Sequence, residues 1–233
     1  DNDRDLAQSY ADELADWIYH RREDWQLHRP STSEAIRIAE SEGEFPVIFA
    51  DRDDNTGGGS PGDSTGMLRA FLDAKLEKAC ILYIVDPEAI QKCHEAGVGA
   101  RLDIEVGSKS TPLQGQPVRL NVEVVALSDG RFYYDGPMYA GLAGNMGPSA
   151  HIKHNELHVL LVNSREQPFC TAFSRTLGLD PKEMKYIGVK SAAHFRAGFE
   201  SWAGAIHVIT EPSVHNPADG KLAFRNLGRV LYP

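Results

Sequence analysis

Apolar residues change their spacing along this chain, and each spacing predicts a different kind of element. Residues 6–18 place an apolar side chain every three or four positions with acidic residues between, which predicts an amphipathic helix ending near residue 22. A second, shorter helix is expected to begin at the N-cap Ser33 and to stop at Gly43. The apolar stripe of the first helix requires a packing partner.

Between residues 47 and 97, short apolar runs alternate with helical patterns. The runs at 47–50 and 80–85 contain no polar alternation, as is typical of parallel strands that are covered on both faces. A helical stripe at 67–76 lies between them, and the three elements together predict a βαβ unit. Asp86 as N-cap and Pro87 at the first helical position predict a further helix.

The period falls to two residues between 101 and 162, where apolar and polar side chains alternate. This pattern predicts half-buried antiparallel strands at 102–106 and 118–124, and a further strand at 157–162. Asp129 and Gly130 between them predict a hairpin turn. We interpret the block as an antiparallel insertion or subdomain.

The α/β pattern returns in the last third of the chain. Helices are expected at 168–177 and around 194–202, and strands at 186–189 and 206–209. The last ~20 residues are rich in proline and glycine and should be mostly loop. The sequence therefore predicts an α/β fold, in which a mainly parallel sheet is flanked by helices and carries an antiparallel β insertion.

Composition excludes several function classes. Of 233 residues, 42% are apolar and 24% are charged, as in an ordinary globular protein. The formal charge of -9 argues against nucleic acid or an anionic membrane as a partner, because both require clustered Lys and Arg. Cys80, Cys93 and Cys170 have the spacing and setting of reduced, buried thiols. Because no signal peptide or bilayer-spanning run is present either, we expect a cytoplasmic protein.

The strongest candidate for a site is the loop 51–65, which follows the predicted strand 47–50. Ligands of open α/β sheets bind at the carboxyl ends of the strands, where this loop lies. Its three consecutive glycines, Gly57, Gly58 and Gly59, could expose N–H groups to a carboxylate or a phosphate. The alternative is that they only make a tight turn.

The polar residues of the same loop also allow two interpretations. Asp63 stands where a nucleotide-binding P-loop requires lysine, which disfavours a triphosphate site; Asp63 or Ser64 could instead cap the next helix. Asp51, Asp53, Asp54 and Asn55 could bind a hard cation or act in proton transfer, because clustered carboxylates raise one another's pKa. The alternative is a set of solvated loop acids.

A second polar loop follows the predicted strand 186–189. If that strand is parallel to the first, Lys190, Ser191 and His194 emerge at the same edge of the sheet as the glycine loop, and the two loops meet. The alternative is that Ser191 caps a helix and His194 lies on the surface.

Three histidines and one cysteine are assigned no chemistry. His151, His154 and His158 flank a predicted hairpin turn and lack the helical spacing of a zinc motif, so we interpret them as surface or strand-face residues. Cys170 lies on a predicted helix without a nearby base, which is typical of a structural thiol.

Several segments, in order, resemble the C-terminal domain of the MlrC (microcystinase C) metallopeptidase-like family, over about residues 33–217. The most specific are in and before the glycine loop, at 46–51, 54–55, 57–59 and 62–65. Further matches lie at 129–132, 136–138, 146–147, 178–181, 189–191 and 194–196. The resemblance implies a zinc-dependent amide or peptide hydrolase.

The same resemblance implies the domain organisation and the metal. The family's zinc ligands lie in an N-terminal domain, so we expect this chain to be a C-terminal portion that works with its own N-terminal catalytic domain and a peptide or small amide substrate. Residues 1–43 would be the helical tail of that domain with a linker, 44–217 the C-terminal-like α/β domain with its insertion at about 101–162, and 218–233 a terminal loop. A homo-oligomer is a further possible partner arrangement for this chain.

The resemblance also implies residue roles. Asp54 and Asn55 match the Asp-Asn pair that faces the metal, and His194 would join them as a catalytic residue. Contacts to the substrate would come from residues of the two polar loops: Asp51, Gly57, Gly58, Gly59, Asp63, Ser64, Lys190 and Ser191. Two other functions remain as alternatives, an anion- or phospho-ligand-binding enzyme domain and a non-catalytic binding or interaction domain.

Overall fold

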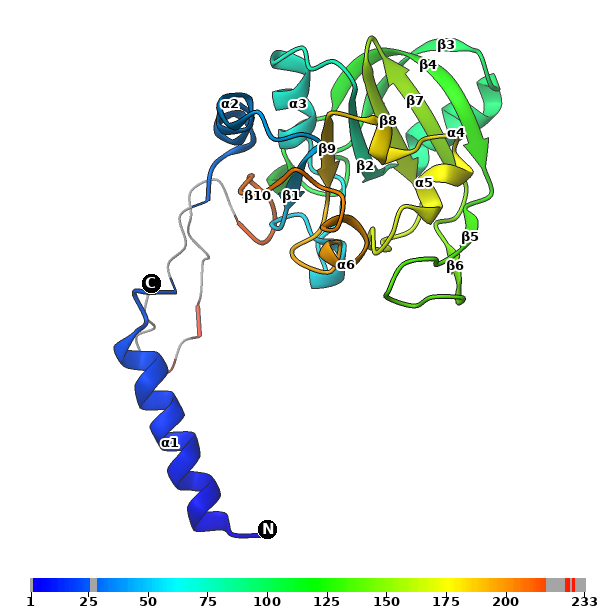
Figure 1. Ribbon diagram of the computed structural model, residues 1–233. Coiled ribbons are helices and arrows are strands. Elements are labelled where there is room, and N and C mark those ends of the chain that lie inside the picture. The colour runs from blue at the N-terminus through cyan, green and yellow to red at the C-terminus, as the bar shows by residue number, and fades with distance from the viewer. Residues whose placement is uncertain (1, 26–28, 217–224, 227, 229–233) are drawn as a thin grey trace.

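The computed structural model describes residues 2–25, 29–216, 225–226 and 228. Within these residues, an 8-stranded sheet has the order β10-β1-β9-β2-β8-β7-β4-β3 (Figure 1). Its strands are β1 (Val47–Asp51), β2 (Ala79–Val85), β3 (Arg101–Val106), β4 (Val118–Ser128), β7 (Ser149–His154), β8 (Leu157–Val162), β9 (Tyr186–Val189) and β10 (Ala205–Ile209). The short strands β5 (Arg131–Tyr133) and β6 (Ala143–Asn145) pair separately. The predicted α/β class is confirmed.

The parallel part of the sheet consists of β10, β1, β9, β2 and β8. Strand β1 and most of β2 are buried along their length, which is why their sequences are continuous apolar runs. The expected βαβ unit is corrected in one respect: β9 lies between β1 and β2, so the two strands are parallel but not neighbours. As a result the loops that follow β1 and β9 leave the sheet side by side.

The antiparallel strands β3, β4 and β7 extend the same sheet and do not form a separate subdomain. Strand β8, expected within the antiparallel block, is the junction, because it pairs parallel with β2 and antiparallel with β7. The predicted hairpin at Asp129 and Gly130 is wrong. Strand β4 pairs with β7, and Gly130, with φ +84, leads the chain out of the sheet into the β5–β6 pair.

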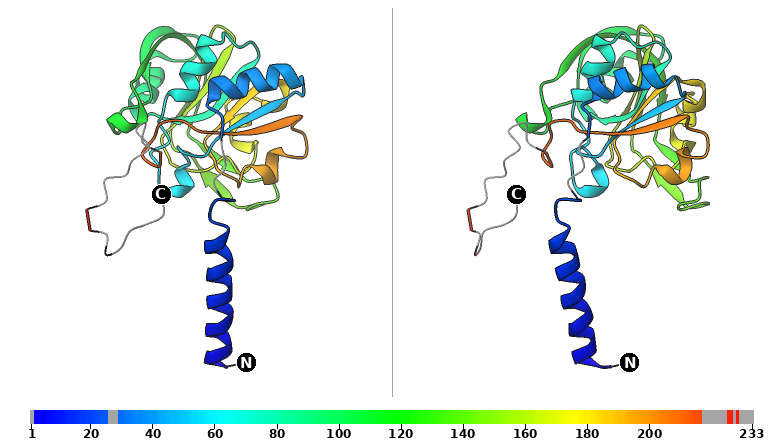
Figure 2. Two further views of the ribbon diagram at one scale, coloured as in Figure 1. Left: turned by 90° about the vertical axis from the view of Figure 1, so that its left-hand side faces the viewer. Right: turned by 60° about the vertical axis from the view of Figure 1, so that its left-hand side comes forward.

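Helices cover both faces of the sheet. One core cluster lies under α2 (Thr32–Glu42), α3 (Gly66–Asp73) and α4 (Pro87–Ala96). The other lies under α5 (Ala172–Thr176), α6 (Arg196–Phe199) and the β5–β6 pair (Figure 2). The free thiols Cys80, Cys93 and Cys170 are buried in these two clusters, as predicted.

Helix boundaries differ from the predictions in three places. Helix α2 is capped by Ser31, not Ser33, because Ser31 and Glu34 form a reciprocal capping box. Helices α5 and α6 are much shorter than the predicted 168–177 and 194–202. The two segments pack backbone against backbone, since a Cβ on Gly198 would lie 2.5 Å from the carbonyl oxygen of Phe169. The predicted loop 218–233 falls almost entirely outside the described residues.

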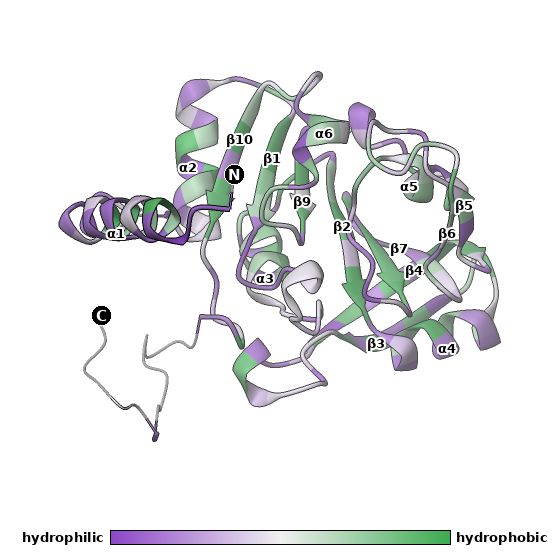
Figure 3. Ribbon diagram, turned by 90° about the horizontal axis from the view of Figure 1, so that it is seen from below, coloured by the Kyte–Doolittle hydropathy of each residue, from purple (hydrophilic) through white to green (hydrophobic). Residues whose placement is uncertain are grey.

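Helix α1 (Arg4–His20) stands away from the body in every view (Figures 1 and 2). Its apolar stripe, coloured green against purple in Figure 3, is not covered by the sheet or its helices in the described part of the chain, and only Trp17 has an aromatic neighbour there, Trp25, with ring centroids 5.9 Å apart. The residues of the stripe are Leu6, Tyr10, Leu14, Trp17 and Ile18, all of them exposed. None of the described helices is both long and apolar enough to cross a membrane.

Two of the histidines form a pair within the β7–β8 hairpin, in which His151 is buried and His158 half-buried. Nδ1 of His151 donates to the carbonyl oxygen of Leu177 at 2.9 Å, so its Nε2 must accept from Nδ1 of His158 at 2.8 Å. Burial is the largest effect; it outweighs the Leu177 hydrogen bond, which would raise the pKa, and with smaller contributions from His158 and Lys153 it lowers the pKa of His151 to about 4. Burial likewise lowers the pKa of His158. The pair is therefore neutral and structural near neutral pH.

This pair makes the stability of the protein depend on pH. Unfolded His151 has an ordinary pKa near 6.5, so between pH 6.5 and about 4 the unfolded state binds more protons and acidification destabilises the fold. We expect about 3 kcal/mol of unfolding free energy to be lost over this range, from about 1.4 kcal/mol per pKa unit. Denaturant unfolding across pH measures it. His151→Gln should flatten the slope, whereas the control His154→Gln should not; equal slopes in both variants would contradict the assignment.

Candidate functional site

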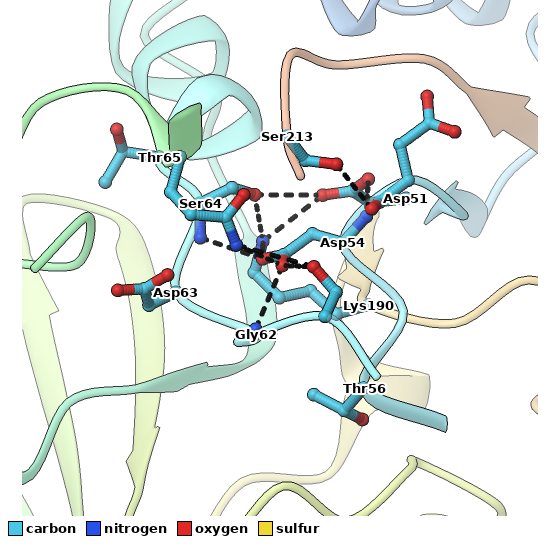
Figure 4. A network of polar contacts seen from close by, with 12 residues as sticks. Asp51, Asp54, Thr56, Gly62, Asp63, Ser64, Thr65, Lys190 and Ser213 are labelled. Atoms are coloured by element: carbon cyan, nitrogen blue, oxygen red, sulfur yellow. Dashed lines mark hydrogen bonds and ion pairs between the residues drawn. The ribbon is translucent and has the colours of Figure 1, made fainter. Parts of the chain in front are cut away.

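The candidate site lies at the carboxyl ends of β1, β8 and β9. Register pairs Ala50 of β1 with Val189 of β9, so Asp51 and Lys190 leave neighbouring strands at the same edge. The loops that follow these two strands meet there, as the sequence predicted (Figure 4). Crevices of this kind are the usual binding places of open α/β sheets.

Asp54 holds the glycine loop in shape. Its Oδ1 accepts from Ser60 Oγ at 2.6 Å, from the Gly62 N–H at 2.9 Å and from Gln114 Nε2 at 2.6 Å. Its Oδ2 accepts from the Ser64 N–H at 2.8 Å. Because Asp54 lies near the start of the loop and its donors come from the second half of the loop and from the distant Gln114, one buried carboxylate ties the two halves together (Figure 4).

Lys190 joins the two loops through ion pairs. Its Nζ lies 2.7 Å from Asp54 Oδ2 and 3.2 Å from Asp51 Oδ2, and it donates to Ser64 Oγ at 2.6 Å. Asp51 also accepts from the Asp54 N–H at 3.1 Å. The side chains of Lys190, Asp51 and Asp54 are at most 1% exposed, so the ion pairs are sealed from solvent. A buried ammonium is tolerated only because these oxygens surround it.

The pKa values of the two carboxylates in the cluster shift in opposite directions. Burial alone would raise the pKa of Asp54, but the Lys190 charge and the hydrogen bonds from Lys190, Ser60 and Ser64 outweigh it and lower the pKa to about 2. For Asp51 burial dominates and raises the pKa, against the pull of Lys190. The two carboxylates raise the pKa of Lys190 despite its burial. Asp54 is therefore the permanently ionised partner of Lys190.

The glycines form a tight turn and not an anion cradle. The N–H groups of Gly57 and Gly58 donate to Asn55, to its Oδ1 at 3.1 Å and its carbonyl oxygen at 3.0 Å, and the Gly59 N–H donates to the carbonyl oxygen of Thr56 at 3.0 Å. Gly59 adopts φ +95, a conformation that favours glycine. Since all three N–H groups are engaged within the loop, none is free for a carboxylate or phosphate.

Asn55 is the member of the Asp-Asn pair that reaches the surface. It is half-buried, and its Oδ1 caps the short turn Thr56–Gly58. Its Nδ2 lies 3.6 Å from the point where a Cβ on Gly58 would be, and the ring of His215 lies 3.0 Å from the same point. The amide nitrogen of Asn55 therefore shares the face of the loop with His215, a residue that sequence reasoning missed.

Asp63 and Ser64 connect the loop to the rest of the chain and do not cap the next helix. Asp63 accepts from the N–H groups of Lys109 and Ser110, both at 2.9 Å, and from Ser110 Oγ at 2.8 Å. Thr65 is the N-cap residue of α3, and no side chain makes a capping hydrogen bond there. The expectation that Asp63 or Ser64 caps this helix is therefore wrong.

Ser191 and His194 are joined to the glycine loop through Gln167, which follows β8. Ser191 Oγ and His194 Nδ1 lie 3.3 and 3.2 Å from Gln167 Oε1. Ser191 is buried, whereas His194 is exposed and precedes the short α6, so the helix-capping alternative for Ser191 is wrong. Sequence reasoning missed both Gln114 and Gln167, because a single glutamine in a loop carries no motif.

The described residues hold no complete metal site. No group of three or more His, Cys, Asp or Glu side chains in the described part of the chain is arranged to hold a metal ion. Asp51 and Asp54 are close together, but Lys190 occupies the place that a cation would take between them. This edge of the sheet can supply hydrogen bonds and shape, and its carboxylates Asp51 and Asp54 are already paired with Lys190.

Breaking the buried ion pairs should destabilise the fold strongly. Lys190→Met leaves Asp51 and Asp54 buried without a counter-charge, so we expect a loss of about 3–5 kcal/mol of unfolding free energy. Denaturant unfolding measures it. The control Lys92→Met removes an exposed ion pair with Glu88 and should leave stability nearly unchanged. A Lys190 variant as stable as the control would show that the cluster does not hold the loop.

The fold has counterparts among known proteins. A crystal structure named "Putative metallopeptidase", from Mesorhizobium sp. BNC1, has a TM-score of 0.80 at 23% identity, over 95% of this chain and 45% of that chain. Microcystinase C of Sphingomonas sp is 32% identical over 167 residues, which are 70% of this chain and 32% of that protein. The chain thus spans about a third of the length of that relative.

The family assignment rests on a match across most of the fold. The family model described as MlrC C-terminus matches residues 49–226, which include the glycine loop, Gln167 and the loop that begins with Lys190. The likeness to the Mesorhizobium protein shows the shared fold, and the similarity to microcystinase C adds sequence identity over 70% of this chain. The chain belongs to the MlrC C-terminus family.

Proposed function

We propose that this chain is the C-terminal portion of a metal-dependent amide or peptide hydrolase and supplies the side of the active site that binds and orients the substrate. Membership of the MlrC C-terminus family and the names of the relatives, a microcystinase and a metallopeptidase, support the reaction class. The observation that carries the proposal is the fixed glycine loop, which holds Asn55 at the carboxyl edge of the sheet.

The two members of the Asp-Asn pair receive different roles. Every hydrogen-bonding direction of the Asp54 carboxylate is used within the protein, so Asp54 acts as a positioning residue. Asn55 keeps its Nδ2 donors for the substrate while its Oδ1 is engaged by Gly57. An amide N–H held at a fixed place can donate to the carbonyl oxygen of a scissile amide as negative charge develops there.

The remaining site residues complete this face. Gly57, Gly58 and Gly59 are exposed and without side chains, so a substrate backbone can approach the loop closely. Lys190 and Ser191 are buried and act by fixing the loops, together with Asp51, Asp63 and Ser64. His194 is the exposed titratable side chain of the second loop and is assigned to proton transfer.

The alternative of an anion- or phospho-ligand-binding domain receives no support from the loop, because the glycine N–H groups are already engaged. A mutation of Asn55 distinguishes the non-catalytic alternative from the proposed hydrolase. If Asn55 takes no part in the reaction, removing its donor leaves kcat of the folded protein unchanged.

Asn55→Asp tests the role of the amide donor in the full-length protein that carries this chain. Aspartate keeps an oxygen that accepts from the Gly57 N–H but has a second, negatively charged oxygen in place of the Nδ2 donors, so the turn is retained, the donor is lost and one charge is added, as in the control below. We expect kcat for a peptide amide to fall about 10²- to 10³-fold, as for the loss of one oxyanion donor.

The matched control is Asn145→Asp, because Asn145 makes the same kind of contact with the Gly147 N–H at 2.8 Å in an exposed loop of the β5–β6 region. It should leave kcat unchanged. Equal hydrolysis by the unmodified protein and Asn55→Asp, with unchanged unfolding, would refute the catalytic assignment.

Zinc is proposed to be held by residues of the longer protein outside the described chain. The groups described here do not fit a zinc site, so we expect this chain, purified alone, to contain zinc well below one equivalent and to be inactive. Metal analysis of the purified chain measures the content. Stoichiometric zinc that is lost in His151→Gln or His158→Gln would contradict this assignment.

A further inference from the structure

Gln167 lies where three loops of the carboxyl edge converge. It follows β8 by a few residues, and its side chain is only 9% exposed. It reaches Gly57 of the loop after β1, and Ser191 and His194 of the loop after β9. Nothing in the family motifs singled it out, yet it is the residue through which His194 contacts the glycine loop.

The contact with the glycine loop explains why residue 57 has no side chain. A Cβ on Gly57 would lie 1.7 Å from Gln167 Nε2, so any larger residue there would displace the amide. The same two loops are joined a second time, since Thr56 Oγ1 donates to the carbonyl oxygen of Glu166 at 3.2 Å. The glycine loop therefore packs against the Gln167 amide and fixes the backbone next to it.

The amide oxygen of Gln167 determines which nitrogen of His194 carries the proton. Oε1 accepts from Ser191 Oγ at 3.3 Å and from His194 Nδ1 at 3.2 Å. Because an amide oxygen can only accept, neutral His194 must be protonated on Nδ1, which leaves Nε2 with a free lone pair. The ring of Phe169 packs edge-on against His194, with centroids 5.8 Å apart, and limits its rotation.

We propose that Gln167 is a positioning residue that holds His194 in the tautomer with an unprotonated Nε2 beside the glycine loop. The inference rests on the proposed hydrolase function, in which Nε2 takes a proton from the attacking water and later gives it to the leaving amine. Gln167 thereby couples the geometry of the Asn55 loop to the proton-transfer residue. It touches neither the substrate nor the reacting atoms.

Nuclear magnetic resonance of the ¹⁵N-labelled chain at mildly alkaline pH reads the tautomer directly. We expect Nδ1 of His194 to be protonated in the unmodified chain. Gln167→Met, similar in length but without an acceptor, should let the Nε2–H form appear, and Gln167→Glu, which keeps an acceptor oxygen, should retain the original tautomer. His154 is the internal reference, because its Nδ1 donates to the carbonyl oxygen of Asn121 and should not change.

Hydrolysis by the full-length protein tests the consequence. Gln167→Met should lower kcat about 10- to 100-fold, less than the 10²- to 10⁴-fold that a whole proton-transfer group contributes, and Gln167→Glu should restore most of it. The control Gln91→Met removes an exposed hydrogen bond to Glu95 on α4 and should have no effect.

The outcomes separate this inference from the proposed function. Two results overturn the positioning role, even if Asn55→Asp abolishes hydrolysis. One is an Nε2–H tautomer of His194 in the unmodified chain; the other is an Nδ1–H tautomer that persists in Gln167→Met. A changed tautomer with unchanged kcat overturns the catalytic consequence alone. If the unmodified full-length protein does not hydrolyse amides, the proposed function fails and takes the proton-transfer role of His194 with it, while the tautomer measurement still decides what Gln167 does.

Discussion

The buried ammonium of Lys190 is the interaction on which the rest of the site depends. A charge removed from water is tolerable only if oxygens surround it, and here Asp51, Asp54 and Ser64 do so at 2.6 to 3.2 Å. To meet this requirement, the loops after β1 and β9 must close on one another. The glycine loop is therefore fixed by the need to neutralise Lys190, more than by its own turn residues.

This constraint gives the two residues of the Asp-Asn pair different surroundings. The Asp54 carboxylate is fully engaged by the loop and by Lys190. Asn55, next in the chain, is only half-buried, and in the proposed function it is the member that meets the substrate. A donor whose position is already fixed by the fold is preorganised. No free energy is then needed to reorient it when negative charge develops on a substrate.

How much of this follows from the sequence depends on the range of the interactions. Local patterns were enough for β1, β2 and the capped start of α4, since burial and capping act within a few residues. The insertion of β9 between β1 and β2 and the exit of the chain at Gly130 depend on pairing between distant segments. Lys190 could be placed at the edge from its position after a strand, but Gln167 could not, because its partners lie in two other loops.

The exposed stripe of α1 bears on where the rest of the proposed active site lies. Burying one large apolar side chain is worth about 1.5–3 kcal/mol, so a helix with Leu14 and Trp17 left in water gains much from a covering surface. In Figure 1, α1 extends away from the body of the fold. In the proposed hydrolase, its apolar stripe is the surface on which a further region of the longer protein would pack. The chain thus needs only to present a rigid hydrogen-bonding edge, and the sealed Lys190 cluster is what makes that edge rigid.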